Sequence, residues 1–167
     1  MKRFFLLLLC ATTAFVGTAQ ESLQDLLALY NTRSIPYISV TELRVAQLNE
    51  TVTILDAREM EEYEVSRIPS ALYVGYTKFS SEEVMNSVPN KETPIVVYCS
   101  LGIRSEEIGE KLKKAGFTNV KNLYGGIFEW KNKEYPILNK DDQETEDVHT
   151  CTKSWGKWLK KGNKIYN

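Results

Sequence analysis

A cysteine between an apolar run and a charged amphipathic segment carries the strongest chemical signal in the chain. Cys99 follows the apolar residues 94–98, which are typical of a buried parallel strand, and precedes residues 104–115, which have helical periodicity. In a loop at that point, backbone N–H groups and the helix N-terminus form a cradle of partial positive charge. The first anion that such a cradle stabilises is the cysteine thiolate itself, which is the nucleophilic form.

The residues of the loop suit a small tetrahedral anion. Gly102 permits a tight turn and a close approach of the backbone to a bound group, and Arg104 offers several donors to an oxyanion. The alternative is a buried cysteine at the end of a strand, followed by an ordinary turn, with Arg104 on a solvated helix face. For the loop alone, both interpretations stay open.

Other groups that could activate a nucleophile or bind a metal are scarce. A thiolate held by a loop needs no histidine base, and the only histidine, His149, lies in a polar tail where we expect no catalytic role. His149 and Cys151 are too few to predict a metal site. Gly125 and Gly126 lack the spacing of a dinucleotide-binding loop, so the sequence predicts no cofactor.

The periodicity of the chain predicts the elements that position this loop. We expect strands over residues 37–40, 52–55, 71–74, 94–98 and 119–122, and helices over residues 22–30, 41–48, 81–87, 104–115 and 125–131. Ser22 and Thr41 are the expected caps of the first two helices, and a polar loop follows the second strand. Alternating strands and helices predict a parallel sheet whose ligands bind beyond the carboxyl ends of the strands, where Cys99 lies.

Four segments in the same order resemble the motifs of the rhodanese-like domain family. They are residues 55–59 with Glu62 and Tyr63, residues 67–71, residues 97–105, and residues 123–126 with Trp130. The second motif departs from the family pattern, because Ser66, Arg67 and Ser70 replace two glycines and a histidine. The resemblance spans residues 52–138 and implies a three-layer α/β fold, with a five-stranded parallel sheet and helices on both faces.

By this resemblance, Cys99 is the residue that forms a persulfide. The resemblance also implies an anion-binding loop made of Ser100, Leu101, Gly102, Ile103, Arg104 and Ser105. Asp56 and Arg58 would support the site, although an ordinary ion pair at the end of a strand is an equally good interpretation of these two residues.

The function that the resemblance implies is sulfur transfer. Such an enzyme moves sulfane sulfur from thiosulfate or a similar small anion to a thiol or cyanide acceptor through the Cys99 persulfide. One alternative is a non-catalytic binding or redox-sensing module, in which Cys99 pairs with Cys151. Another is a cysteine phosphatase or arsenate reductase, but those enzymes use a longer loop than the four residues between Cys99 and Arg104.

The N-terminal residues 1–19 have the layout of a signal peptide. Two basic residues precede an apolar run at residues 4–9, and Ala19 fits the small position before a cleavage site at Gln20. We therefore expect an exported protein, periplasmic or secreted. The alternative is a lipid anchor at Cys10. The apolar run is too short to predict a membrane span.

The remaining residues predict one domain with a distinct C-terminal segment. We expect residues 20–50 to begin the domain, residues 51–139 to form its core, and residues 140–167 to add an acidic linker and a basic tail. Trp155 and Trp158 in this tail predict docking on the domain's own surface, and the alternative is contact of residues 148–167 with a protein partner or a membrane. With a net charge of -1, the protein has no overall positive electrostatic field that would attract nucleic acid.

Overall fold

The computed structural model of the chain describes residues 22–166. The predicted signal peptide at residues 1–19, the expected mature N-terminus at Gln20 and the alternative lipid anchor at Cys10 lie outside these residues. Within residues 22–166, no helix combines the length and the apolar character that crossing a membrane requires.

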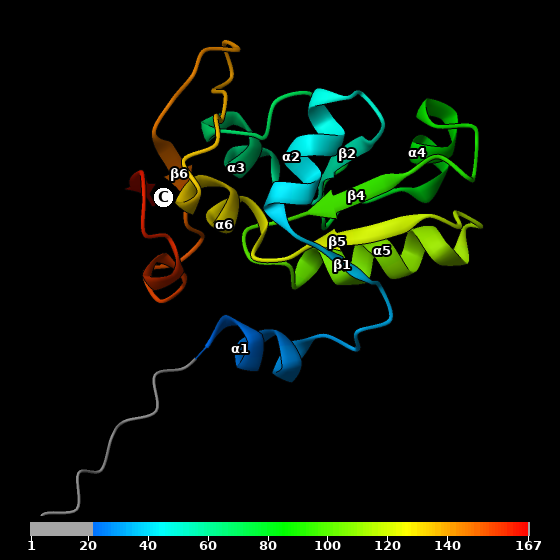
Figure 1. Cartoon of the computed structure of the whole chain (residues 1–167), viewed down its shortest axis with the longest axis horizontal. Coiled ribbons are helices and arrows are strands. Elements are labelled where there is room, and N and C mark those ends of the chain that lie inside the picture. Colours follow the sequence, from blue (N-terminus) through cyan, green and yellow to red (C-terminus); the bar gives the residue numbers. More distant parts are fainter. Residues whose placement is uncertain (1–21, 167) are drawn as a thin grey trace, which may run out of the picture.

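Five parallel strands form one sheet in the order β1-β5-β4-β2-β3 (Figure 1). The strands are β1 (Tyr37–Ile38), β2 (Thr53–Asp56), β3 (Leu72–Tyr73), β4 (Ile95–Tyr98) and β5 (Val120–Leu123). The central strand β4 pairs with both β2 and β5, so Val97 lies between Leu55 and Asn122. All four residues of β4 are buried, as expected for a continuous apolar run in a parallel sheet. The predicted α/β fold with a five-stranded parallel sheet is confirmed.

Helices pack on both faces of this sheet. They are α1 (Leu23–Tyr30), α2 (Val40–Leu48), α3 (Met60–Val65), α4 (Ser81–Ser87), α5 (Arg104–Lys114) and α6 (Gly126–Asn132). Successive residues of a strand point to opposite faces, so β4 contributes to two hydrophobic cores. Val96 joins one core with Leu43 of α2 and Ile127 of α6. Val97 joins the other core with Leu112 of α5.

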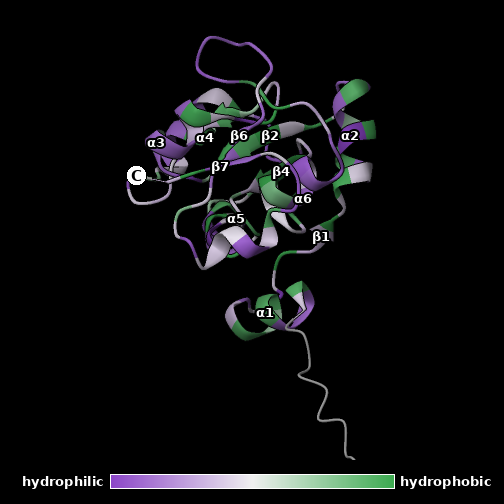
Figure 2. Ribbon diagram, turned by 90° about the vertical axis from the view of Figure 1, so that its left-hand side faces the viewer, coloured by the Kyte–Doolittle hydropathy of each residue, from purple (hydrophilic) through white to green (hydrophobic). Residues whose placement is uncertain are grey.

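Helix α1 forms where the sequence predicts it. The side chain of Ser22 accepts a hydrogen bond from the backbone N–H of Asp25 at 3.1 Å, which caps the first turn. Leu27 is buried and Leu29 is 77% exposed, and Figure 2 shows both hydrophobic and hydrophilic residues around this helix. Its buried side faces the domain, which makes it an amphipathic helix.

Helix α3 corrects the expected polar loop after β2. Its only buried residue is Glu62, so it has no apolar face that could produce helical periodicity in the sequence. Its start is stabilised by two hydrogen bonds: the Glu62 side chain accepts from the backbone N–H of Glu59 at 3.1 Å, and the Glu59 carbonyl oxygen accepts from the backbone N–H of Glu62 at 3.1 Å. The cap at Glu59 and the acidic residues in the first turn therefore stabilise this helix in place of a hydrophobic face.

The cap of helix α2 lies two residues before Thr41, the residue that the sequence predicts as the cap. Ser39 is the cap, since its side chain accepts from the backbone N–H of Glu42 at 3.2 Å and Glu42 accepts from the backbone N–H of Ser39 at 2.9 Å. Val40 consequently starts the helix, and β1 ends at Ile38 instead of continuing to residue 40. The capping box at Ser39 stabilises the helix enough to outweigh the preference of the β-branched Val40 for an extended conformation.

The C-terminal segment folds onto the domain. It contains β6 (Asp147–His149), a 3₁₀ helix, η1 (Trp155–Trp158), and β7 (Asn163–Ile165), and Figure 1 shows it beside α6. Val148 and Leu159 are buried in the core that faces α2 and α6, and both tryptophans pack against that core. The tail therefore docks on the domain's own surface, as the sequence favours.

The acidic segment at residues 140–147 is exposed in its first residues but is not a free linker. Glu144 pairs with Leu138 in an isolated β-bridge, and Glu146 makes an ion pair of 2.6 Å with Lys131 of α6. Arg67 donates to the carbonyl oxygen of Asn139 at 2.7 Å just before the segment. The acidic composition predicts the solvent exposure, but it does not reveal these attachments.

Candidate active site

The sulfur of Cys99 lies at the carboxyl edge of the sheet, directly after β4, and the residue is 2% exposed. Its Sγ accepts hydrogen bonds from the backbone N–H of Gly102 at 3.1 Å and from the backbone N–H of Ser105, and it lies 3.5 Å from the Ser105 hydroxyl. The first donor comes from the loop and the second from the first turn of α5. The chain thus turns two donors towards the sulfur, which is the arrangement expected for a stabilised thiolate.

Gly102 makes the tight turn of this loop possible. Its φ of +112° is a conformation that L side chains rarely adopt, and a Cβ there would lie 3.2 Å from the carbonyl oxygen of Leu123. The carbonyl oxygen of Gly102 accepts from the side-chain amides of Asn31 and Asn122, each at 2.8 Å. Neither asparagine was predicted as a site residue. A polar residue in the predicted strand at residues 119–122 was the available signal for Asn122.

The surroundings of Cys99 favour its ionised form. Burial by itself raises the pKa of the thiol, but the charge of Arg104 and the hydrogen bonds from Ser105 and Gly102 outweigh it, so that the pKa is lowered. The Ser105 hydroxyl donates its single proton to Asn122 Oδ1 at 2.7 Å, which orients the residue. A lowered pKa increases the population of the nucleophilic thiolate near neutral pH.

Arg104 is held in a bidentate ion pair with Glu62 of α3. Its Nη1 lies 2.6 Å from Glu62 Oε2 and its Nη2 lies 2.8 Å from Glu62 Oε1. Nη2 also donates to the hydroxyl of Ser100 at 3.1 Å. Burial raises the pKa of Glu62, but the hydrogen bonds and the charge of Arg104 lower it to about 2. Glu62 belongs to a motif in the sequence, but its contact with Arg104 was not predicted, because α3 forms where a loop was expected.

Asp56 and Arg58 form a fully buried ion pair beside the site. Arg58 Nη2 lies 2.6 Å from Asp56 Oδ2 and 2.5 Å from the carbonyl oxygen of Ser66. The hydroxyl of Tyr98, the residue before Cys99, donates to Asp56 Oδ2 at 2.5 Å. These bonds join the ends of β2 and β4 to residue 66, so the geometry gives the pair a supporting position.

A cavity of about 260 Å³ opens over the sulfur of Cys99. Five of the seven predicted loop residues line it, and two residues of the C-terminal segment complete it: Cys99, Ser100, Leu101, Ile103, Arg104, Cys151 and Trp155. The other two predicted residues, Gly102 and Ser105, contact the sulfur itself. Trp155 in this wall was not predicted, and Cys151 was expected near Cys99 only in the alternative in which the two cysteines pair, because only the folded tail brings these residues to the loop.

Cys151 and His149 lie closer to this site than the sequence indicates. The Cys151 thiol donates to Glu62 Oε1 at 3.0 Å, and Arg104 Nη2 lies 3.4 Å from its sulfur. His149 is 4% exposed, and its Nδ1 accepts from the backbone N–H of Cys151 at 3.2 Å. His149 is therefore buried beside the site, although it belongs to a polar tail in the sequence. Both Cys99 and Cys151 are free thiols in the described part of the chain.

Glu62, His149 and Cys151 also bring three ligand atoms within 4.8 Å of one another, a spacing that a metal ion could use. The guanidinium of Arg104 already contacts both oxygens of Glu62 and lies beside the Cys151 sulfur. A cation bound there would face this positive charge at close range, and it would compete for ligand atoms that already have partners. The arrangement therefore suits anions and thiols better than a metal.

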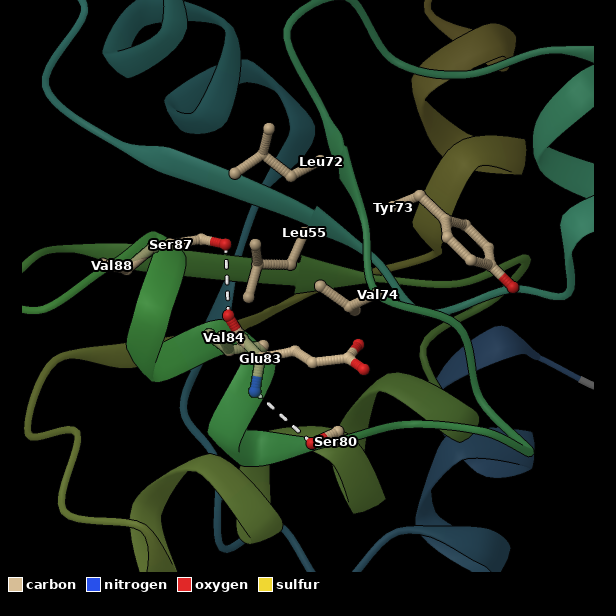
Figure 3. A pocket seen from close by; sticks show the side chains of 9 residues that line it. All are labelled: Leu55, Leu72, Tyr73, Val74, Ser80, Glu83, Val84, Ser87 and Val88. Carbon is tan, nitrogen blue, oxygen red and sulfur yellow. Dashed lines mark hydrogen bonds between the residues drawn. The ribbon is translucent and has the colours of Figure 1, made fainter.

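A larger cavity of about 450 Å³ lies between β2, β3 and α4 (Figure 3). None of the predicted site residues lines it. Its serines serve helix α4: Ser80 caps the helix by accepting from the backbone N–H of Glu83, and Ser87 donates to the carbonyl oxygen of Glu83. We therefore place the chemistry in the smaller cavity over Cys99.

Relatives of known name match the central part of the chain. The chain is 38% identical to a tRNA uridine(34) hydroxylase of Listeria welshimeri over 104 residues, which cover 59% of this chain and 32% of that protein. It is 31% identical to a thiosulfate sulfurtransferase, GlpE, of Coxiella burnetii over 97 residues, which cover 57% of this chain and 88% of that protein. The chain thus spans about a third of the hydroxylase and most of the sulfurtransferase.

The fold is shared with solved structures. A thiosulfate sulfurtransferase from Pseudomonas aeruginosa superimposes with a TM-score of 0.60 at 22% identity, covering 76% of this chain and 24% of that chain. The family model described as the rhodanese-like domain matches residues 39–133, which include β4, the Cys99 loop and α5. With more than half of its length matched, the chain belongs to the rhodanese-like domain family.

Proposed function

We propose that the protein is a sulfurtransferase, which accepts sulfane sulfur from thiosulfate or a similar small anion as a persulfide on Cys99 and passes it to a thiol or to cyanide. The observation that carries the proposal is the environment of the Cys99 sulfur. The sulfur lies buried at the wall of a cavity and accepts hydrogen bonds from Gly102 and Ser105. These bonds and the charge of Arg104 lower the pKa of the thiol.

Loading begins with attack by the Cys99 thiolate. Its Sγ forms a bond to the outer sulfur of thiosulfate, the sulfur–sulfur bond of the donor breaks, and sulfite leaves with the electron pair of that bond. The donors on Gly102 and Ser105 would stabilise the thiolate before the attack and the polarised sulfur after it. The lowered pKa increases the fraction of Cys99 that is ionised, and that fraction attacks without another base.

Arg104 would attract the donor anion into the cavity. Its side chain is 20% exposed and borders the cavity, while Glu62 occupies two of its nitrogen atoms. The guanidinium carries five N–H groups, so donors remain for a sulfonate oxygen. Glu62 also fixes the orientation of Arg104, which limits the entropy that binding must overcome.

The relatives support this proposal. One is named a thiosulfate sulfurtransferase, and the matched region covers most of its length. The hydroxylase is matched over only a third of its length, so its reaction on tRNA belongs to a larger protein. The short loop, with four residues between Cys99 and Arg104, favours sulfur over the larger phosphate group.

The test is the formation of thiocyanate from thiosulfate and cyanide. We expect the purified protein to produce it and the variant Cys99→Ser to lose the activity entirely, with unchanged thermal unfolding as the control for folding. Ser154→Ala is a matched control, because it removes an exposed hydroxyl on the C-terminal segment without altering the cavity lining. Equal activity of Cys99→Ser and the wild type would refute the proposal.

We also propose that the chain is exported, based on the layout of residues 1–19. N-terminal sequencing of the protein from its natural host checks this proposal. We expect the mature chain to begin at Gln20, and a chain that retains residues 1–19 would contradict it.

A further inference from the structure

Cys151 lines the same cavity as Cys99. It lies 51 positions after Ser100, the residue that follows Cys99. The Ser100 hydroxyl lies 3.9 Å from the Cys151 sulfur, and Arg104 Nη2 lies within 3.4 Å of the same sulfur. Arg104 also acts electrostatically on Cys99. The two thiols therefore face one cavity and interact with the same cation.

The two thiols differ in their access to solvent. Cys99 is buried at 2% exposure, whereas Cys151 is exposed. A small acceptor such as cyanide can enter a cavity of about 260 Å³. A cysteine of a folded acceptor protein cannot reach the bottom of this cavity, because the backbone that carries it is too large to enter. An exposed thiol at the edge of the cavity can reach such an acceptor.

The backbone holds Cys151 in this place. Its φ is +59°, in the left-handed region that non-glycine residues seldom occupy, and its N–H donates to His149 Nδ1 at 3.2 Å. Its thiol donates to Glu62 Oε1 at 3.0 Å. Such conformations persist where the surroundings fix them, and they are common at functional sites.

We propose that Cys151 is an internal acceptor, which takes the sulfane sulfur from the Cys99 persulfide and presents it to thiol acceptors outside the cavity. This inference rests on the proposed sulfurtransferase function. It adds a second sulfur-carrying residue to that function and names the class of final acceptor as an external thiol, including the thiol of a protein.

The transfer is a displacement at the outer sulfur of the persulfide. Cys151 Sγ forms a bond to the outer sulfur, and the bond between that sulfur and Cys99 Sγ breaks, leaving its electron pair on Cys99. The proton of the Cys151 thiol moves to the transferred sulfur. The Cys99 persulfide anion and the Cys151 thiol thus become the Cys99 thiolate and the Cys151 persulfide, and no external oxidant or reductant is consumed.

The hydrogen bonds direct the attack to the outer sulfur. Gly102 and Ser105 contact Cys99 Sγ, the inner sulfur of the persulfide, and they stabilise the thiolate that leaves. The outer sulfur extends into the cavity, where Cys151 is part of the wall. Attack on the inner sulfur would instead expel sulfide and leave a Cys99–Cys151 disulfide.

The acidities of the two thiols favour the same direction. Although the residue is exposed, its sulfur is partly shielded against Glu62 and Ser100, and this desolvation raises the pKa of Cys151 to about 11; the Glu62 carboxylate adds to the effect and Arg104 opposes it. The pKa of Cys99 is lowered. The thiolate of lower pKa is the better leaving group, so the equilibrium places the sulfur on Cys151, while the small thiolate population of Cys151 at neutral pH sets the rate of the attack.

The experiment locates the transferred sulfur. The full-length protein is loaded with less than one equivalent of thiosulfate, quenched with an alkylating agent at increasing times and digested with trypsin. Cys99 falls in the peptide of residues 92–104 and Cys151 in that of residues 141–153, while Cys10 falls in a third peptide. Mass spectrometry then measures which cysteine carries one extra sulfur atom.

We expect the sulfur to appear first on Cys99 and then mostly on Cys151. In Cys151→Ser it should remain on Cys99, and in Cys99→Ser neither peptide should gain sulfur. Ser154→Ala should behave as the wild type.

Sulfur that stays on Cys99 in the wild type would overturn the relay and leave the proposed function standing. Sulfur on Cys151 in Cys99→Ser, or a Cys99–Cys151 disulfide with released sulfide, would also overturn it. Absence of sulfur from both cysteines in the wild type and in Cys151→Ser would instead refute the proposed function itself.

Discussion

Replacement of Glu62 by glutamine removes the charge that holds Arg104. The pKa of this buried carboxyl is lowered from 4.5 to about 2, and that difference corresponds to about 3 kcal/mol of favourable interaction of the ionised form. A carboxyl group whose pKa is lower in the folded state stabilises the fold above its unfolded pKa. The contribution is therefore complete above about pH 5 and is lost as the pH falls towards 2.

Urea unfolding at several pH values measures this contribution. At pH 7 we expect Glu62→Gln to lower the free energy of unfolding by about 3 kcal/mol, because Arg104 loses its buried partner. The difference between wild type and variant should shrink as the pH approaches 2. Glu64→Gln removes the same charge from an exposed position of α3 and should change stability by less than about 0.5 kcal/mol.

Two results would refute the reasoning. One is a loss of stability in Glu62→Gln no larger than that in Glu64→Gln. The other is a difference between wild type and Glu62→Gln that is independent of pH between 2 and 7. Either result would mean that the ion pair with Arg104 contributes no net stability to the fold.

Three further predictions concern the loop and its support. Arg104→Ala should raise the pKa of Cys99, because burial then acts without its strongest opponent; the pH dependence of thiolate absorbance measures this, and an unchanged titration would argue against it. Gly102→Ala should destabilise the protein by about 1 to 3 kcal/mol, since the φ of +112° strains any side chain; thermal unfolding checks this, with Gly116→Ala, whose Cβ meets nothing within 4 Å, separating strain from crowding. Asp56→Asn should cost about 3 to 5 kcal/mol in urea unfolding by leaving Arg58 charged and buried, and a wild-type midpoint would contradict that role.

The parts of the fold that follow from local patterns were predictable. The apolar run at residues 94–98 predicts a buried strand, and the structure places β4 at the centre of the sheet with Cys99 after it. The spacing of Ser22 and the following leucines predicts α1 and its cap. In each case the hydrophobic period or the capping residue can be recognised from residues that are close together in the sequence.

The missed features depend on contacts between distant segments. Helix α3 buries a single charged residue, Glu62, so no hydrophobic period reveals it, and its partner Arg104 is 42 residues away. Cys151 reaches the cavity only because Val148 and Leu159 anchor the tail in the core. A single sequence carries no signal for such pairings, since side-chain composition does not say which distant segment will pack there.

Intact mass spectrometry after incubation with thiosulfate tests the central claim most directly. With no more than one equivalent of thiosulfate, the reduced wild-type protein should gain the mass of one sulfur atom, cyanide should remove it, and Cys99→Ser should gain nothing. Sulfur uptake by Cys99→Ser equal to that of the wild type, or no uptake by a fully reduced wild-type protein from thiosulfate or polysulfide, would contradict a persulfide on Cys99.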